Sequence, residues 1–427
     1  MIHQPLRVMI VGAGTGGLCL AHGLKSDGVE VSVFERDETP SDRLQGYRLS
    51  LSAIGIRALK ECLPAAVFEK LVESAAIPSQ GLTFLDHRMT RLLEISFPRS
   101  DGKTVESELP VSRINLRRTL LEGLDGIVHF GKKFVAFQDA PNGAVTACFE
   151  DGSTATGDVL IGADGASSHL RTQLLPQASR VETGIMVVSG KFGLNEDVRA
   201  STPEPIFRGP TLILGPHGCF LFTSAIDYGE KSSAGITVAT APDPLSSDRE
   251  EYVMWGFSAY RERFPLPSNV EALDGEVLKD AVVTLMDEWH PDLVHLVRSA
   301  EVPTLTAFAV KTSVPIPPWK TRNVTLLGDA LHNMTPYRGI GANTALRDAV
   351  ALRRALVSVD RGEDHLIEAL AAYEREMIDY GFRAVRASLK NMERFHAQSG
   401  LARTFTKTVF RTIGLIPPLQ GVFLESR

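Results

Sequence analysis

A glycine turn near the amino terminus constrains the fold of this 427-residue chain more than any other feature. Gly12, Gly14 and Gly17 stand in the order G-x-G-x-x-G. Apolar runs and helical spacing around them predict a strand, a helix and a second strand, over residues 6–11, 15–26 and 29–34. This is one βαβ unit, and its two strands become parallel neighbours because such crossovers are right-handed.

The glycine turn has the properties of a diphosphate cradle. Gly12 permits the tight turn, Gly14 lets the backbone approach a pyrophosphate, and Gly17 lets the helix pack close to the strand. The helix N-terminus then offers free N–H groups to the negative charge. Glu35, followed by Arg36, ends the second strand, where a carboxylate can accept hydrogen bonds from the ribose hydroxyls of an adenosine. The unit therefore predicts a dinucleotide, either FAD or NAD.

Two later segments predict further strands of the same sheet. Residues 158–161 lead into Gly162-Ala-Asp164-Gly165, and residues 324–327 lead into Gly328-Asp329. Between them, alternating and aromatic-rich runs predict an antiparallel sheet that could wall a pocket, at residues 184–192, 211–226 and 234–239. From residue 365 to 398 the pattern is helical and amphipathic.

The two aspartate turns also carry a family resemblance. Gly162–Arg171 looks like the DG motif of class A flavoprotein monooxygenases, the para-hydroxybenzoate hydroxylase type. Gly328–His332 looks like their GD motif, which continues through Pro336, Gly339, Gly341 and Asn343. Arg113–Leu120, which precedes both segments, resembles the family's R-x-x-L stretch that lies beside the flavin. The similarity spans residues 6 to about 356 in the family's order, and three matched motifs are far more specific than one.

The resemblance implies FAD as the cofactor and NAD(P)H as the co-substrate. Asp329 would accept a hydrogen bond from a ribityl hydroxyl, and the main chain at Gly339 and Gly341 would approach the isoalloxazine ring. A helix that begins near Asn343 would direct its positive end at the flavin edge that becomes anionic on reduction. The expected FAD-binding residues are Gly12, Gly14, Gly17, Glu35, Arg36, Arg48, Arg113, Asp164, Gly165, Asp329, Gly339, Gly341, Ala342 and Asn343.

Several side chains in this set have two interpretations. Arg48 aligns with an arginine that family members place near the FAD diphosphate, but a solvated arginine at a strand end has the same spacing. The catalytic candidates are Pro336, Arg338 and Tyr228. Many members have small residues where this chain has Tyr337 and Arg338, a version that resembles members from fungal secondary metabolism. Arg338 could neutralise reduced flavin or an acidic substrate group, or pair with a structural carboxylate. Tyr228 could orient a substrate or be an ordinary core residue.

The expected fold is α/β, with a Rossmann-like FAD-binding domain, an inserted antiparallel-sheet substrate domain and a helical C-terminal tail. The FAD-binding domain would be discontinuous, over residues 1–75, 108–180 and 301–360. The substrate domain would cover residues 76–107 and 181–300, and the helical region residues 361–427.

The implied reaction is monooxygenation through a flavin C4a-hydroperoxide. NAD(P)H and O₂ would serve to hydroxylate or epoxidise an electron-rich, mostly apolar small molecule, such as an aromatic, indole or terpenoid compound. NAD(P)H would bind without a Rossmann domain of its own, because a second G-x-G-x-x-G is missing. An FAD-dependent dehydrogenase or oxidase, or a non-redox cyclase on a flavin scaffold, fits the same motifs. A flavin halogenase would carry W-x-W-x-I-P, whereas Trp255, Trp289 and Trp319 stand alone.

Composition limits the partners. The net charge of −6 argues against broad nucleic-acid binding. The four cysteines are far apart and form no C-x-x-C pair, which indicates reduced thiols, and no histidine pair has metal-ligand spacing. The amino terminus lacks the pattern of a secretory signal, and no apolar stretch reaches 18 residues. We therefore expect a cytoplasmic monomer or homodimer without a membrane span.

Overall fold

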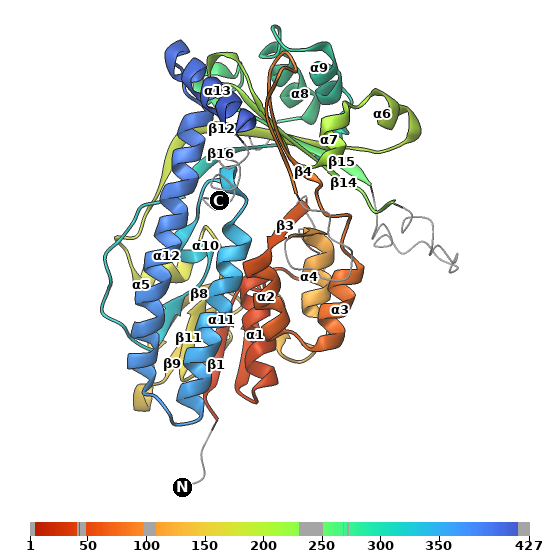
Figure 1. The fold of residues 1–427 in the computed structure, drawn as a ribbon. Coiled ribbons are helices and arrows are strands. Elements are labelled where there is room, and N and C mark those ends of the chain that lie inside the picture. Colours follow the sequence, from red (N-terminus) through yellow and green to blue (C-terminus); the bar gives the residue numbers. More distant parts are fainter. Residues whose placement is uncertain are drawn as a thin grey trace. The chain divides into compact units, whose positions relative to one another are not determined.

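A five-stranded parallel sheet, with strands drawn from residues 7 to 326, organises one of the two units of the chain (Figure 1). The computed structural model describes residues 5–40, 42, 48–97, 108–229, 251–267, 269–270 and 273–416. The chain forms two units, residues 1–75, 105–181 and 311–389 in the first, and residues 76–104, 182–310 and 390–427 in the second. Residues 361–427, expected as a region of their own, divide between the two units. Which unit holds FAD and which holds substrate stays a prediction.

The parallel sheet of the first unit has the strand order β17-β11-β1-β2-β7. Its strands are β1 (Arg7–Val11), β2 (Glu30–Phe34), β7 (Val128–His129), β11 (Val159–Gly162) and β17 (Val324–Leu326). Four of the five were predicted to within two residues, because buried parallel strands read as short apolar runs. The helices α1 (Thr15–Ser26), α2 (Ala53–Cys62) and α11 (Gly341–Asp360) lie alongside one another (Figure 1).

The first unit also holds two smaller antiparallel sheets. One pairs β3 (Arg48–Ser52) with β6 (Glu108–Ser112), and the other contains β8 (Phe134–Asp139), β9 (Val145–Phe149) and β10 (Thr154–Gly157). The remaining helices are α3 (Ala65–Glu73), α4 (Arg113–Leu121), α5 (His169–Leu174), α10 (Asp329–His332) and α12 (Leu366–Phe395), which continues into the second unit.

The second unit is built on a seven-stranded sheet in the order β16-β12-β15-β14-β13-β4-β5. These strands are β4 (Gly81–Asp86), β5 (Arg91–Ser96), β12 (Arg180–Gly193), β13 (Thr211–Leu214), β14 (Phe220–Ile226), β15 (Tyr252–Tyr260) and β16 (Thr306–Ser313). β13 pairs with β4 in parallel, while β12, β15, β14 and β13 pair with one another in antiparallel. The helices are α6 (Glu196–Ser201), α7 (Glu204–Arg208), α8 (Gly275–Thr284), α9 (Pro291–Arg298) and α13 (Gly400–Leu415).

The predicted α/β architecture, with its parallel sheet, antiparallel sheet and C-terminal helices, is confirmed. Residues 211–226 form two strands rather than one, because Pro216 and Gly218 break the run and Gly215 N–H bonds to the Cys219 carbonyl at 2.8 Å. The strand expected at 234–239 lies outside the described residues. None of the described helices combines the length and the apolar character needed to cross a bilayer.

The second unit contains a buried histidine that should make its stability depend on pH. His396 Nε2 lies 2.9 Å from the Ser258 hydroxyl and Nδ1 lies 2.8 Å from the Met392 carbonyl. Burial lowers the pKa of His396 to about 4, from 6.5. Between pH 6.5 and pH 4 the unfolded chain therefore binds a proton at His396 that the folded chain does not bind. The free energy of unfolding falls as pH falls from 6.5 to 4, by about 3 kcal/mol.

We expect His396→Gln to reduce the loss of stability below pH 6.5. Plotted against pH, the melting temperature of the variant should fall less below pH 6.5 than that of the wild type. His295→Gln, which changes an exposed histidine of the same unit, serves as the control and should follow the wild-type curve. An unchanged loss of stability below pH 6.5 in His396→Gln would show that another group is responsible.

Candidate functional site

Three turns that are distant in the sequence meet at one edge of the parallel sheet. β11 lies between β1 and β17, and all three run in the same direction, so their carboxyl ends are neighbours. The chain leaving each strand stays in register, since Ala163 N–H bonds to the Val11 carbonyl at 2.8 Å and Leu327 N–H bonds to the Gly162 carbonyl at 2.9 Å. The carboxyl edge of an open parallel sheet is where ligands bind in α/β proteins.

The glycines of the first turn differ in what surrounds them. Gly12 has φ +108°, and a Cβ there would meet the Ala163 carbonyl oxygen at 2.4 Å. A Cβ on Gly17 would lie 2.3 Å from the Gly12 carbonyl oxygen, so this position allows α1 to approach β1. Gly14 has an ordinary extended backbone, and a Cβ there would come within 4 Å of no other part of the chain that the structure describes. The N-cap residue, Gly14, has no side chain to cap α1, and the first N–H groups of a helix have no partner within the helix.

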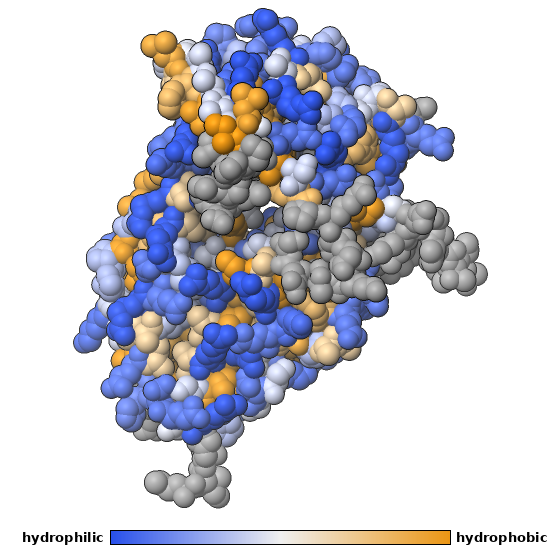
Figure 2. Space-filling view, viewed as in Figure 1, coloured by the Kyte–Doolittle hydropathy of each residue, from blue (hydrophilic) through white to orange (hydrophobic). Residues whose placement is uncertain are grey.

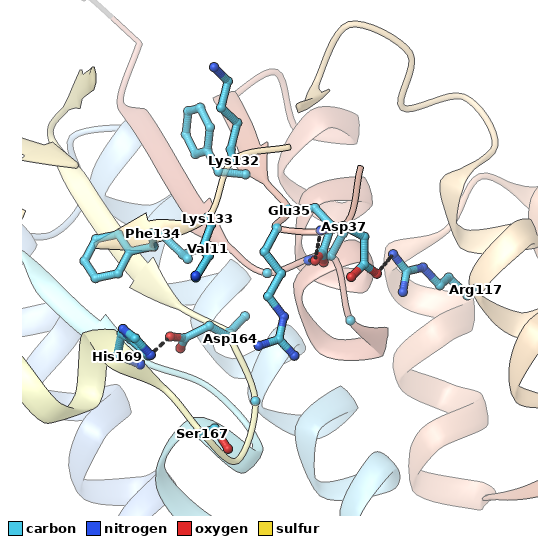
Figure 3. A pocket seen from close by; sticks show the side chains of 17 residues that line it. Val11, Glu35, Asp37, Arg117, Lys132, Lys133, Phe134, Asp164, Ser167 and His169 are labelled. Carbon is cyan, nitrogen blue, oxygen red and sulfur yellow. Dashed lines mark hydrogen bonds and ion pairs between the residues drawn. The ribbon is translucent and has the colours of Figure 1, made fainter. Parts of the chain in front are cut away.

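Glu35 is held on the same edge by backbone hydrogen bonds. Its buried carboxylate accepts from Ala13 N–H at 2.7 Å and from Asp37 N–H at 3.0 Å. Asp37 in turn accepts from Arg117 Nη2 at 2.9 Å. Figure 3 shows these three side chains close together beside a recess of about 240 Å³. The recess contains the segments that follow β1, β2 and β11, including Arg36, and the residues 132–134.

Asp164 occupies the second turn with one acceptor unused. Its Oδ2 accepts from His169 N–H at 2.9 Å, as Figure 3 shows, whereas Oδ1 is buried and has no partner among the described residues. Burial raises the pKa of Asp164. Buried acceptors normally have donors, so an acceptor left open at a ligand-binding edge fits a donor on a bound molecule. The adjoining Gly165 has φ +75° and also faces open space.

The third turn brings Asp329 to the start of α11. A Cβ on Gly341 would lie 3.9 Å from Asp329 Oδ1. Burial raises the pKa of Asp329, and the positive charges of His332 and Arg113 oppose that rise. Arg113, at the start of α4, is therefore close enough to Asp329 to act on its charge. The first turn of α11, with Ala342, has no side-chain cap, and Gly339 turns with φ +63° into open space.

A buried network fixes the third turn from behind. Asp348 on α11 accepts from Gly328 N–H and from His332 Nε2, both at 2.7 Å, and from the Tyr380 hydroxyl at 2.5 Å. Burial opposes a charge on His332, but the Asp348 carboxylate outweighs it and raises the pKa of His332. Arg171 Nη1 joins the second turn to the third, because it donates to the Ala166 and Ala330 carbonyls at 3.0 and 2.9 Å.

Two residues expected at the cofactor make other contacts with their side chains. Asn343 Oδ1 accepts from Ser52 N–H at 2.8 Å and Nδ2 donates to the Ser50 carbonyl at 3.0 Å, which ties β3 to α11. The Arg48 side chain is only 5% exposed and pairs with Glu108 at 2.9 Å, so it is not a solvated arginine. Neither residue lines the recess in Figure 3, so their roles toward FAD stay predictions.

The three catalytic candidates belong to different units. Pro336 and Arg338 lie in one short helical turn of the first unit, closed by Gly339 N–H on the Pro336 carbonyl at 3.0 Å. Burial lowers the pKa of Arg338. Tyr228 is buried in the second unit, where its N–H bonds to Glu251 Oε1 at 3.1 Å. Their catalytic roles remain predictions.

The recess also contains residues that sequence reasoning missed. Asp37 stands two positions after Glu35, and Arg117 stands one helical turn after Arg113, so both had a signal in their spacing. No sequence signal marked the segment of Lys132, Lys133 and Phe134, because the strand that precedes it, β7, is only two residues long. Ser167 and His169 also line the recess and lie inside the DG-like segment.

The donors and acceptors along this edge fit an FAD molecule. Free N–H groups and an open Gly14 suit a diphosphate, and the Glu35 carboxylate suits ribose hydroxyls. The Asp329 carboxylate beside an uncapped helix N-terminus suits the polar edge of a flavin.

Comparisons with known proteins point the same way. A family model described as an FAD binding domain matches residues 5–388. The FAD-dependent monooxygenase phnB of Penicillium herquei is 29% identical over 408 residues, which cover 93% of this chain and 92% of that protein. The dual O-methyltransferase/FAD-dependent monooxygenase elcB of Phaeosphaeria nodorum is 31% identical over 94% of this chain and 45% of that protein. This chain thus spans about half the length of such dual-function relatives.

Solved structures share the fold. A Photorhabdus luminescens protein, assigned as an FAD-containing monooxygenase, superposes with a TM-score of 0.80 at 33% identity, over 92% of this chain and all of that one. Klebsiella pneumoniae HpxO, complexed with FAD and uric acid, superposes with a TM-score of 0.78 at 24% identity, over 97% of this chain and 95% of that one. At that identity the second match shows the fold alone.

Proposed function

Because the chain belongs to the class A FAD-dependent monooxygenases, the family whose FAD-binding domain matches residues 5–388, we propose that it is itself such a monooxygenase. It would use NAD(P)H and O₂ to insert one oxygen atom into an electron-rich, mostly apolar small molecule. The observation that carries the proposal is the meeting of three turns, around Gly14, Asp164 and Asp329, at one edge of the parallel sheet.

Each turn has a task that its own groups can perform. N–H groups at the start of α1 bind the diphosphate, and Glu35 orients the adenosine end. Asp329 accepts from a ribityl hydroxyl, and the start of α11 places a positive dipole end where negative charge develops on reduction. FAD, when bound, supplies the redox chemistry that passes an oxygen atom from O₂ to the substrate.

The dual-function relatives favour hydroxylation over epoxidation. Their names join an O-methyltransferase to an FAD-dependent monooxygenase, and this chain covers 45% to 47% of their length. A hydroxyl group is a suitable acceptor for an O-methyltransferase, and hydroxylation of an aromatic ring creates one. We therefore propose an aromatic substrate that leaves as a phenol. An indole or terpenoid alcohol would fit the same reasoning less directly.

The test is to purify the chain with its flavin and to measure oxidation of NADH and NADPH in the presence of candidate aromatic compounds. One O₂ consumed per NAD(P)H, with one ¹⁸O atom from ¹⁸O₂ in the product, is the expected result. A product without ¹⁸O would indicate a dehydrogenase or oxidase. Turnover with oxidised flavin and no reductant would indicate a non-redox cyclase.

We expect Asp329→Ala to weaken FAD binding roughly 10- to 100-fold, because a hydrogen bond to a charged group is worth about 1.5–3 kcal/mol. Titration of the apoprotein with FAD measures the effect. Asp280→Ala, which removes an exposed carboxylate from α8, is the matched control and should bind FAD like the wild type. Equal affinity in both variants would remove Asp329 from the cofactor site.

A further inference from the structure

The last helix of the described chain has one docked face and one exposed face. On the docked face of α13, the ring centroids of Phe410 and Phe84 are 4.3 Å apart. Lys407 Nζ lies 3.6 Å from Asp86 Oδ2 on the same face. A Cβ on Gly414 would come within 3.5 Å of the Leu92 carbonyl oxygen on β5. These contacts attach α13 to the sheet of the second unit and leave its opposite side in solvent.

The exposed face of α13 is apolar. Leu401 is 86% exposed, Phe405 is 70% exposed and Leu415 is 82% exposed, and Val409 continues the stripe. Leu401, Phe405 and Val409 are spaced four residues apart, so they share one side of the helix. Figure 2 shows apolar side chains gathered over α13. Large apolar side chains exposed together mark an interaction surface.

Three of the four threonines of α13 add little polarity to the helix surface. The hydroxyls of Thr406, Thr408 and Thr412 donate to the carbonyls four residues earlier, at 3.0, 2.9 and 3.0 Å. A hydroxyl that is bonded within its own helix needs no partner from water, as for serine and threonine in lipid-exposed helices. Thr408 and Thr412 are exposed and can therefore enter an apolar environment at low cost.

The charge on α13 has one sign. The helix carries Arg403, Lys407 and Arg411 and no aspartate or glutamate, and of these three Lys407 is paired with Asp86 on the docked face. Arg411 is exposed beside the apolar stripe. The Arg411 side chains of two copies of this face would repel each other, whereas a surface with negative charge would attract Arg411.

We propose that the exposed face of α13 binds a membrane surface that contains anionic lipids. Leu401, Phe405, Val409 and Leu415 insert at the headgroup level, and Arg411 pairs with lipid phosphate. An amphipathic helix with an apolar stripe and only basic charges lies in the plane of the interface and does not cross it. The 16 residues of α13 fit this arrangement, since they are too few to span a bilayer.

The experiment uses the full FAD-loaded chain and sucrose-loaded vesicles. The protein should sediment with vesicles of phosphatidylcholine and phosphatidylglycerol, and less with phosphatidylcholine alone. Phe405→Glu should lower the partition coefficient roughly tenfold or more, because an apolar side chain leaves the interface and a repelled charge replaces it. Leu401→Glu should act in the same way, and Arg411→Gln should lower binding about fivefold.

Val277→Glu is the matched control, since it puts a carboxylate on α8 of the same unit in place of an apolar residue that is 45% exposed. It should sediment like the wild type, and all four variants should keep their flavin absorption. No sedimentation of the wild type, or equal sedimentation of Phe405→Glu, Leu401→Glu and Val277→Glu, would overturn the proposal. So would a dimer in analytical ultracentrifugation that Phe405→Glu dissociates while vesicles bind nothing, because the face would then be a protein interface.

Discussion

Replacing Gly14 with alanine should weaken FAD binding at least about 100-fold and leave the fold intact. The backbone at Gly14 has φ −82° and ψ 178°, which alanine adopts without strain. Apart from its neighbours in the chain, the new methyl group would meet no atom of the described residues within 4 Å, so it creates no clash with them. It would instead occupy the space in front of the N–H groups of α1, where the diphosphate must lie to receive their hydrogen bonds.

Titration of the apoprotein with FAD, followed by flavin fluorescence, measures this loss. The melting temperature of the apoprotein should change little, since the weaker helix cap costs about 1 kcal/mol. Gly400→Ala changes a glycine at the start of another helix, where the nearest atom would be 4.0 Å from the new Cβ, and it should bind FAD normally. If Gly14→Ala bound FAD as tightly as Gly400→Ala, the diphosphate would not lie at this turn.

Replacing Glu374 with glutamine should stabilise the protein above neutral pH. Glu374 lies on α12, and its carboxylate accepts from the hydroxyls of Thr321 at 2.5 Å and Thr325 at 2.9 Å. Burial raises the pKa of Glu374 to about 7, from 4.5, despite these donors. The folded protein therefore keeps a proton that the unfolded chain releases between pH 4.5 and 7. The contribution of Glu374 to the free energy of unfolding is fully present below pH 4.5. It is lost as pH rises through 7, and the loss is about 3 kcal/mol.

A glutamine keeps an acceptor for one threonine and carries no charge, so the variant avoids this loss. Its melting temperature should match the wild type near pH 4.5 and exceed it at pH 8. Glu376→Gln, on the same helix but at an exposed position paired with Arg347, should change stability by no more than about 0.5 kcal/mol at either pH. A glutamine variant less stable than the wild type at pH 8 would show that the buried carboxylate is ionised and stabilising.

The sequence predicted the strands and turns that form the cofactor edge because each has a local signal. A buried parallel strand is a short apolar run, and the turns after β1, β11 and β17 are marked by Gly12, Asp164 and Asp329. Their convergence also followed from the sequence, since parallel strands of one sheet end at the same edge.

The contacts that support this edge could not be predicted in the same way. Asp348 binds Gly328, which lies twenty residues earlier, and Glu374 accepts from Thr325, which lies 49 residues earlier. Such partners depend on how helices pack on the sheet, and no local pattern encodes that packing. The identity of a residue in a motif also does not say where its side chain points. The Asn343 side chain is directed to the backbone at Ser50 and Ser52.

A crystal structure of the chain with FAD tests the convergence of the three turns most directly. One FAD molecule should place its diphosphate against the N–H groups after Gly14 and its adenosine ribose against Glu35. Its flavin should lie beside Asp329 and the start of α11. An FAD molecule that touches only one of these turns, or that lies elsewhere on the chain, would contradict the monooxygenase site described above.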